Sequence, residues 1–176
     1  MPKQSAGILV YRKKNDTVEV FLVHPGGPFW KNKDDYAWSI PKGMYEENED
    51  AFNAAKREFT EETGQTAPEG EYSELGTVKL ASGKEVAAWA VESDLGNVQI
   101  KSNTFSLEWP PKSGKQQEFP EVDRARWFDL SAATRKIHPG LNDLLRRLAE
   151  TLKVTFSDQS TGSLEDKLND TQISLL

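Results

Sequence analysis

Residues 43–65 read GMYEENEDAFNAAKREFTEETGQ and contain the clearest helical signal in the chain. From Asp50 to about Thr63 the segment is rich in Ala, Glu, Lys, Arg and Phe and has no Gly or Pro. These are mostly residues that favour a helix. Gly64 follows as a C-terminal stop, because glycine adopts the left-handed conformation that ends many helices. The sequence therefore predicts a helix over residues 50–63.

This helix would carry acidic side chains on the face that its small residues mark as buried. At 100° per residue, three alanines share one face: Ala51, Ala54 and Ala55. Three carboxylates fall on that same face, one or two turns further along: Glu58, Glu61 and Glu62. Burying three like charges is costly unless a cation compensates them. Oxygen ligands are what Mg²⁺ or Mn²⁺ select, so one interpretation is a metal site. The other is that Arg57 and Lys56 pair with these acids and the cluster only supports the helix.

The spacing of the fixed residues resembles the Nudix box, G-x5-E-x7-R-E-h-x-E-E-x-G-h, where h is a bulky apolar residue. The matching positions are Gly43, Glu49, Arg57, Glu58, Phe59, Glu61, Glu62 and Gly64. Only Gln65 departs from the pattern, at a position that affects packing after the helix. Residues 5–12 also look like the first core strand of the Nudix family, and residues 38–43 like its approach to the box. The resemblance covers residues 5 to about 150.

The resemblance implies an α/β fold, an α/β/α sandwich around a mixed β-sheet. It also implies hydrolysis of a nucleoside diphosphate linked to another moiety, with Mg²⁺ or Mn²⁺ as cofactor. By position, the metal ligands would be Glu58, Glu61 and Glu62, joined by a main-chain carbonyl from Lys42 or Gly43. One of the glutamates, Glu61 or Glu62, would also polarise the attacking water. Arg57 would lock the cluster by an ion pair within the box, to Glu49.

The resemblance further implies a glutamate on a loop shortly before a strand with Arg-x-Trp. Here Arg124-Ala125-Arg126-Trp127 follows an acidic segment. Its spacing to Trp127 favours Glu121 as general base or extra metal ligand, with Glu118 as the alternative. Either residue could also be an ordinary acidic loop residue.

Four residues are candidates for binding substrate. Lys42 could meet a phosphate as a point charge, or be a solvated loop lysine. His24, before a Pro-Gly-Gly-Pro loop, could help to hold an anion, although strand-end packing is the stronger interpretation. Trp30 and Tyr36, in a polar loop, are candidates for stacking on a nucleobase. We expect other aromatic residues, such as Phe105, to be mostly core.

The rest of the chain predicts strands and one more helix. Residues 7–11 and 18–23 should form a hairpin, and 75–80 with 85–91 a second one. Residues 104–109 form a short apolar piece, 110–115 a loop and 124–130 a strand. One helix face is marked by Leu141, Leu144, Leu145 and Leu148. Residues 1–153 are thus one Nudix-like domain, and 154–176 a weakly ordered or peripherally docked tail.

Composition narrows the classes of function. The 176 residues include 28 acidic and 22 Lys and Arg side chains, a formal charge of −6. This balance disfavours a nucleic acid polymer, and an inositol polyphosphate would need a strongly basic pocket, so a small nucleotide is the expected substrate. With no cysteine, disulfides are excluded and a cytoplasmic location is expected. We expect no signal peptide and no membrane span, because no apolar run approaches ~20 residues.

Several alternatives remain open on the sequence. The substrate could be a nucleoside triphosphate, including a damaged one, or a dinucleoside polyphosphate. A diphosphoinositol polyphosphate hydrolase is a further alternative. The chain could also be a catalytically silent Nudix-fold module that binds a nucleotide or a protein. Nothing in the sequence indicates the oligomeric state.

Overall fold

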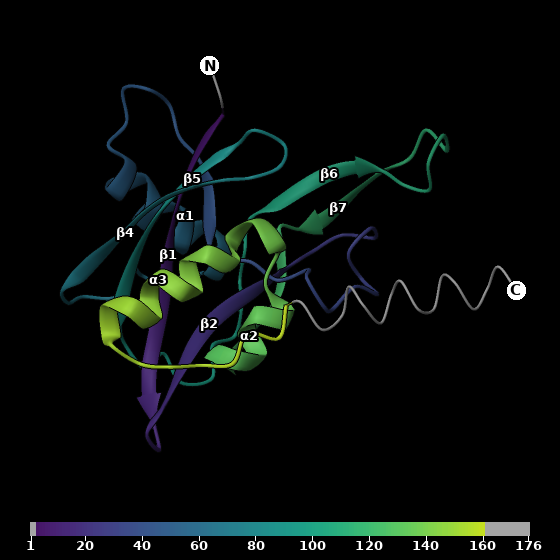
Figure 1. Cartoon of the computed structure of the whole chain (residues 1–176). Coiled ribbons are helices and arrows are strands. Elements are labelled where there is room, and N and C mark those ends of the chain that lie inside the picture. The colour runs from purple at the N-terminus through teal and green to yellow at the C-terminus, as the bar shows by residue number, and fades with distance from the viewer. Residues whose placement is uncertain (1–2, 161–176) are drawn as a thin grey trace, which may run out of the picture.

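The computed structural model describes residues 3–160, which form a mixed β-sheet with helices on both faces (Figure 1). The elements in chain order are β1 (Gln4–Lys14), β2 (Thr17–Pro25), β3 (Lys42–Met44), α1 (Ala51–Thr63), β4 (Tyr72–Lys79), β5 (Glu85–Glu92), β6 (Thr104–Glu108), β7 (Gln116–Pro120), β8 (Val122–Asp129), α2 (Leu130–Lys136), the 3-10 helix η1 (Pro139–Leu141) and α3 (Asn142–Leu152). The main sheet has the order β4-β5-β1-β2-β8, and β3 pairs with β1. Strand β1 is parallel to β5, and the other pairs in this sheet are antiparallel. Strands β6 and β7 form a separate two-stranded sheet.

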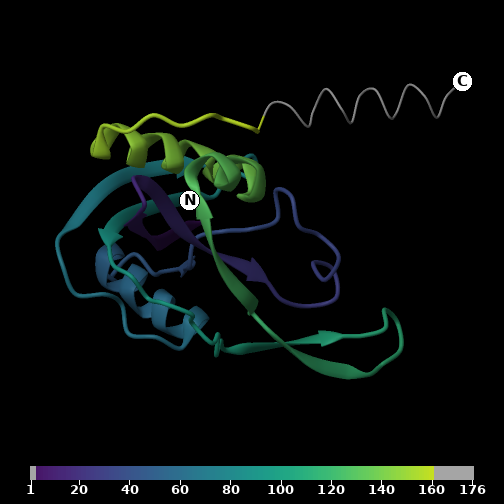
Figure 2. The same cartoon turned by 90° about the horizontal axis from the view of Figure 1, so that it is seen from below.

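The central strand β1 is buried on both faces and separates two hydrophobic cores. Its residues Ile8 and Val10 join the core beneath α1, with Phe59 of that helix. Leu9 and Tyr11 point the other way, into the core that contains the leucines of α3. This alternation follows from the two-residue period of a strand. Figure 2 shows α1 on one side of the sheet and α2 with α3 on the other, so the predicted α/β/α sandwich is confirmed.

Most predicted elements are present, with bounds close to those expected. The β1–β2 and β4–β5 hairpins form as predicted. Helix α1 ends at Gly64, which has φ of 75° and donates its N–H to the Thr60 carbonyl. The predicted helix face of α3 is also correct, since Leu144, Leu145 and Leu148 are fully buried.

Four short elements were not predicted: α2, β3, β7 and η1. The expected strand over 124–130 ends at Asp129, whose side chain accepts a hydrogen bond from the Ala132 N–H and caps α2. A helix of seven residues is too short for a clear period. Strand β7 has a polar sequence and pairs only with β6, so it lacks the alternation that reveals a half-buried strand. Strand β3 has only three residues.

The described part of the expected tail, residues 154–160, lies against the domain. Val154 and Phe156 pack on the core. The Ser157 N–H donates to Ser131 Oγ of α2 at 2.9 Å. Residues 161–176 lie outside the described residues. Within residues 3–160, none of the helices has the length and apolar character needed to cross a bilayer.

Candidate active site

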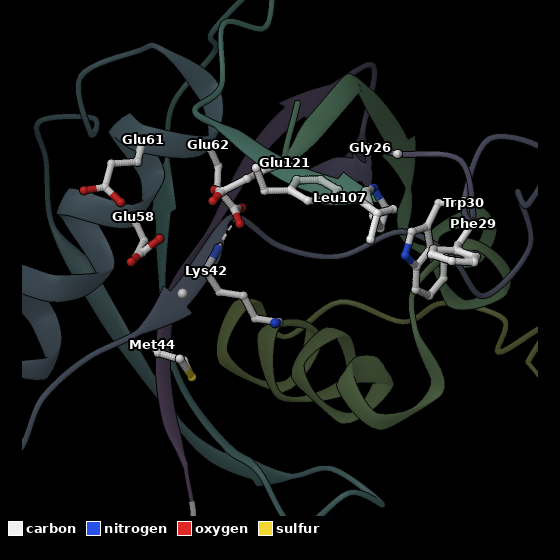
Figure 3. A pocket seen from close by; sticks show the side chains of 14 residues that line it. Gly26, Phe29, Trp30, Lys42, Met44, Glu58, Glu61, Glu62, Leu107 and Glu121 are labelled. Atoms are coloured by element: carbon white, nitrogen blue, oxygen red, sulfur yellow. Dashed lines mark hydrogen bonds between the residues drawn. The ribbon is translucent and has the colours of Figure 1, made fainter. Parts of the chain in front are cut away.

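A cavity of about 630 Å³ lies between α1, β3, the loop after β2 and the β6–β7 hairpin. One end is acidic and is lined by Glu58, Glu61, Glu62 and Glu121. The other end is apolar and is lined by Phe29, Trp30, Phe105 and Leu107. Figure 3 shows the acidic end on one side, the Lys42 side chain between, and Trp30 with Phe29 at the opposite side. The cavity thus offers different chemistry to the two ends of one elongated ligand.

Helix α1 and strand β3 fix the acidic end together. Glu58 is 8% exposed and lies against Gly43 of β3. A Cβ on Gly43 would lie 2.1 Å from the Glu58 carboxyl carbon, so only glycine allows this approach. Glu62 accepts the backbone N–H of Lys42 at 3.1 Å. The spacing of residues 43–62 therefore does more than place the acids on α1. It also sets the contacts between β3 and α1.

Arg57 is one of the two cations of α1, with Lys56, and it binds three glutamates. Its Nε and Nη2 donate to the two carboxylate oxygens of Glu49 at 2.9 and 3.1 Å, which is the ion pair expected from the sequence. Its Nη1 donates to Glu58 at 2.7 Å and to Glu61 at 3.3 Å. In the described chain it makes no hydrogen bond to Glu62. Internal ion pairing by Arg57 therefore compensates part of the negative charge on the acidic face. The charge of Glu62 is not compensated by Arg57, which leaves the metal-site interpretation open.

The pKa values of the acids reflect this unequal compensation. Burial raises the pKa of Glu62 to about 8. Burial also raises the pKa of Glu58, against the opposing effect of Arg57. The pKa of Glu121 is raised by burial and by repulsion from Glu61. Each of these acids would be stabilised in its ionised form by an additional cation.

The donor set at the acidic end fits a hard divalent cation. All of the side-chain donors are carboxylate oxygens, the type that Mg²⁺ and Mn²⁺ prefer. In residues 3–160, no three His, Cys, Asp or Glu side chains already have the spacing of a closed metal site. Glu58 and Glu61 are instead directed to Arg57. A metal at this end would therefore require these carboxylates to turn from Arg57 toward the cavity.

Glu121 reaches the acidic end from the opposite side of the cavity, and its backbone is held at both sides. Its N–H donates to the Asn103 carbonyl, and its carbonyl accepts from the Gly26 N–H, both at 2.9 Å. Glu118 is exposed, lies in β7 opposite Ser106, and is not part of the cavity lining. Of the two sequence candidates, the structure thus brings only Glu121 to the carboxylates. The segment containing Glu118 is the paired strand β7, so the interpretation of Glu118 as an acidic loop residue was wrong.

Lys42 lies between the two ends of the cavity. Its side chain runs away from the carboxylates toward α3 (Figure 3). Among the described residues its ammonium forms no ion pair, and its pKa is lowered, chiefly by burial. A partly buried ammonium without a counter-ion is well suited to meet an anionic ligand.

The remaining sequence candidates separate into one that lines the cavity and two that do not. Trp30 does line it. His24 is fully buried, with both ring nitrogens bonded within the protein, which corresponds to the packing interpretation. The Tyr36 hydroxyl donates to the Ser160 carbonyl outside the cavity. We therefore exclude His24 and Tyr36 from the cavity wall.

Several wall residues were not assigned to the site on sequence. Phe105 and Leu107 project from the same face of β6, two residues apart, and line the apolar end. Phe29 is 57% exposed and stacks edge-on with Trp109 at 5.6 Å between ring centroids. The alternation of Phe105 and Leu107 with polar residues was a usable signal. Nothing in the sequence indicated which cavity this face would line.

Comparison with known proteins identifies the family to which this chain belongs. The model of the NUDIX domain family matches residues 1–148. The chain belongs to the Nudix family. One relative is an 8-oxo-(d)GTP phosphatase of Mycolicibacterium smegmatis, 31% identical over 130 residues, which are 68% of this chain and 38% of that protein. Another is an RNA pyrophosphohydrolase of Caulobacter vibrioides, 42% identical over 57 residues, which are 30% of this chain and 33% of that protein. The matched residues thus span only about a third of the length of either relative.

Two solved structures share the fold. One is a C. elegans Ap4A hydrolase binary complex, with a TM-score of 0.59, 24% identity, and coverage of 86% of this chain and 98% of that one. The other is the NUDIX domain of Shewanella oneidensis NrtR with ADP ribose, with a TM-score of 0.60, 17% identity, and coverage of 86% and 89%. At these identities the likeness concerns the fold alone.

Proposed function

We propose that the chain hydrolyses a phosphoanhydride bond of a nucleoside polyphosphate by attack of water at phosphorus, with Mg²⁺ or Mn²⁺. The observation that carries this proposal is the cavity with carboxylates at one end, aromatic side chains at the other and Lys42 between them. A polyphosphate needs its negative charge neutralised, whereas a nucleobase needs an apolar slot. The two ends of the cavity meet these needs in the order in which a nucleotide presents them.

The residues take separate roles in this proposal. Glu58, Glu61 and Glu62 would hold the divalent ion, together with a main-chain carbonyl of Lys42 or Gly43. The ion would neutralise phosphate oxygens and lower the pKa of a water. Glu121, opposite them, would accept a proton from the attacking water. Its raised pKa brings a carboxylate closer to the range in which it works as a base at neutral pH. Arg57 acts through Glu49, Glu58 and Glu61 and does not contact substrate.

The other cavity residues favour a nucleotide over the remaining substrates. Lys42 is the one basic residue that lines the cavity within the described chain, which is too little positive charge for an inositol polyphosphate. Trp30 and Phe105 offer ring surfaces for a base. The names of the two relatives, an 8-oxo-(d)GTP phosphatase and an RNA pyrophosphohydrolase, support a nucleoside triphosphate end as the reacting group. A dinucleoside polyphosphate is the second candidate, because the exposed Phe29 and the half-buried Trp109 add a further aromatic pair at the rim.

A substrate panel with identified products tests this proposal. Nucleoside triphosphates, including oxidised ones, dinucleoside polyphosphates and a diphosphoinositol polyphosphate would each be incubated with Mg²⁺ or Mn²⁺. Release of pyrophosphate indicates a triphosphate substrate, and release of ATP indicates a dinucleoside tetraphosphate. The Glu62→Gln variant is the control for contaminating activity. Nucleotide binding without turnover of any compound would reject hydrolysis and favour a silent binding module.

A further inference from the structure

A second cavity, of about 520 Å³, lies beside α1 and away from the carboxylates of the candidate active site. One wall is the stretch of α1 from Phe52 to Thr60. The other is the segment of residues 66–70, with Tyr72 at the start of β4. None of these wall residues lines the first cavity. The volume is in the range of sites that bind small molecules, so this second cavity is a separate candidate site.

Aromatic side chains form one side of the second cavity, and contacts within the protein fix their positions. The rings of Phe52 and Tyr72 meet edge-on with 4.9 Å between centroids, and Trp89 of β5 lies 5.3 Å from Phe52. The Tyr72 hydroxyl donates to the Pro68 carbonyl at 2.6 Å, which ties the segment after α1 to β4. The walls are thus held in place, and the rings offer a surface to a planar group.

Lys56 supplies positive charge to the second cavity. Its ammonium lies 4.6 Å from the centroid of the Phe52 ring, and within residues 3–160 it forms no ion pair. Arg57 also lines this cavity, but its N–H groups already donate to three glutamates and a main-chain carbonyl. Lys56 is therefore the cation that is available to meet an anion here.

A hydrogen-bond acceptor, Glu69, lies on the opposite wall of the second cavity. The pKa of Tyr72 is raised by burial and by repulsion from Glu69, which places this carboxylate near the phenol. In the described chain Glu69 has no ion-pair partner. A carboxylate accepts hydrogen bonds, so Glu69 can accept from an amino group of a ligand.

We propose that the second cavity binds a nucleoside monophosphate. The phosphate would meet Lys56, the base would lie against Phe52 and Tyr72, and an amino group of the base would donate to Glu69. Inorganic phosphate would use the cation alone, and a neutral aromatic compound the rings alone, so the combination favours a ligand that carries both groups. Adenine, guanine and cytosine have such an amino group, whereas uracil has none. The proposal does not depend on the proposed hydrolysis, because the two cavities share no wall residue.

The direct test is a titration of the ¹⁵N-labelled full chain with adenosine monophosphate in EDTA, followed by amide chemical shifts. EDTA keeps divalent ions from the carboxylates of the first cavity, which then repel a phosphate. We expect saturable shifts of the amides of residues 66–72 and constant shifts for residues 26–30. Shifts confined to residues 26–30 would overturn the inference. So would the absence of saturable shifts up to about 10 mM, a concentration that corresponds to very weak binding.

Two lysine variants separate a specific contact from a general effect of charge. Lys56→Gln should weaken the binding of adenosine monophosphate about fivefold or more, because hydrogen bonds to charged groups are stronger than neutral ones. Lys79→Gln removes the same charge at the far end of β4, where Lys79 is exposed, and should leave Kd unchanged. Equal weakening by both changes would overturn the site.

The choice of base tests the contact to Glu69. Adenosine monophosphate should bind the wild type about threefold or more tightly than uridine monophosphate, the value of one modest hydrogen bond. Glu69→Ala should remove most of this preference. Equal binding of the two nucleotides to the wild type would overturn the assignment of the ligand. So would inorganic phosphate that shifts the same amides with the affinity of adenosine monophosphate, since the base would then contribute nothing.

Discussion

At the scale of single residues, burial raises the pKa of Glu62, and Arg57 makes no hydrogen bond in the described chain that would offset this effect. Its guanidinium donates hydrogen bonds to both carboxylate oxygens of Glu49. The same guanidinium also donates to the carboxylates of Glu58 and Glu61. Glu62 receives only the backbone N–H of Lys42 as a hydrogen-bond donor in the described chain. The internal ion pairs therefore compensate the cluster incompletely. This imbalance is the physical argument for a further cation, and it could not be read from the spacing of the acids.

We predict that Glu61→Gln and Glu62→Gln each fold normally and lose most of their turnover. The change removes charge at the proposed metal site and keeps volume and helix propensity. Millimolar Mg²⁺ should raise the melting temperature of the wild type, because the ion binds only the folded cluster, and should raise that of the variants less. The measurements are kcat and thermal melts. Substantial turnover by both variants at saturating Mg²⁺ would rule out these residues as ligands.

We predict that without divalent ions the protein becomes less stable as pH rises toward about 8. The pKa of Glu62 is raised to about 8 in the folded chain, so between its ordinary value and about 8 the folded state holds a proton that the unfolded state has lost. Stability therefore falls over this window. Melts in EDTA at about pH 6.5 and pH 8.5 should differ by about 2 °C or more. Glu62→Gln should show a smaller difference, and an equal difference would assign the effect to other groups.

We predict that Glu121→Gln lowers kcat by ~10²-fold or more, the range of a positioned general base, and changes KM far less. The backbone of Glu121 is bonded to Asn103 and Gly26, which supplies the fixed position that a base needs. Glu118→Gln is the matched control, because Glu118 is exposed on β7. Loss of kcat in the control with normal turnover in Glu121→Gln would refute the assignment.

At the scale of elements, the predictable parts are those with a strong local signal. Helix α1 was predictable because Asp50 to Thr63 has no breaker and Gly64 ends it. Its carboxylates were predictable as a cluster by helical geometry. Strand β7 was not predictable, because it depends on pairing with β6 and has no buried face to impose a pattern. The apolar wall of the cavity was missed for the same reason, since it requires the β6–β7 hairpin to lie beside the loop after β2.

The hairpin is held against that loop by close contacts, and these support a prediction for the apolar wall. A Cβ on Gly27, which has φ of 94°, would lie 2.9 Å from the ring of Phe105. If this ring receives a nucleobase, Phe105→Ala should raise KM about 5- to 100-fold, the value of one base-stacking contact, with kcat nearly unchanged. Phe119→Ala is the control, because Phe119 packs on Phe105 and does not line the cavity. Equal effects of the two changes would indicate hairpin stability instead of stacking.

At the scale of the whole molecule, the placement of helices on both faces of the sheet could be predicted from the sequence of strand β1. Residues 7–11 are all apolar, which in a strand means burial on both faces, and the structure buries Ile8 with α1 and Leu9 with α3. The relation between the C-terminal segment and the substrate loop did not follow from the sequence. Residues 154–160 bring Ser160 to the Tyr36 hydroxyl, a contact between positions far apart in the chain.

This contact leads to a prediction about chain length. A chain that ends after Ser160 should keep the fold and turnover, because the cavity residues and the contacts of 154–160 are retained. A chain that ends after Lys153 loses the packing of Val154 and Phe156 on the core and the Ser157 bond to Ser131. It should melt several degrees lower, since burial of two apolar side chains contributes roughly 2–4 kcal/mol when partly exposed groups are discounted. Melts and steady-state kinetics of both chains test this. If the chain ending at Ser160 folds normally but is inactive, residues 161–176 contribute to the active site and the proposed boundary of the domain at residue 153 is wrong.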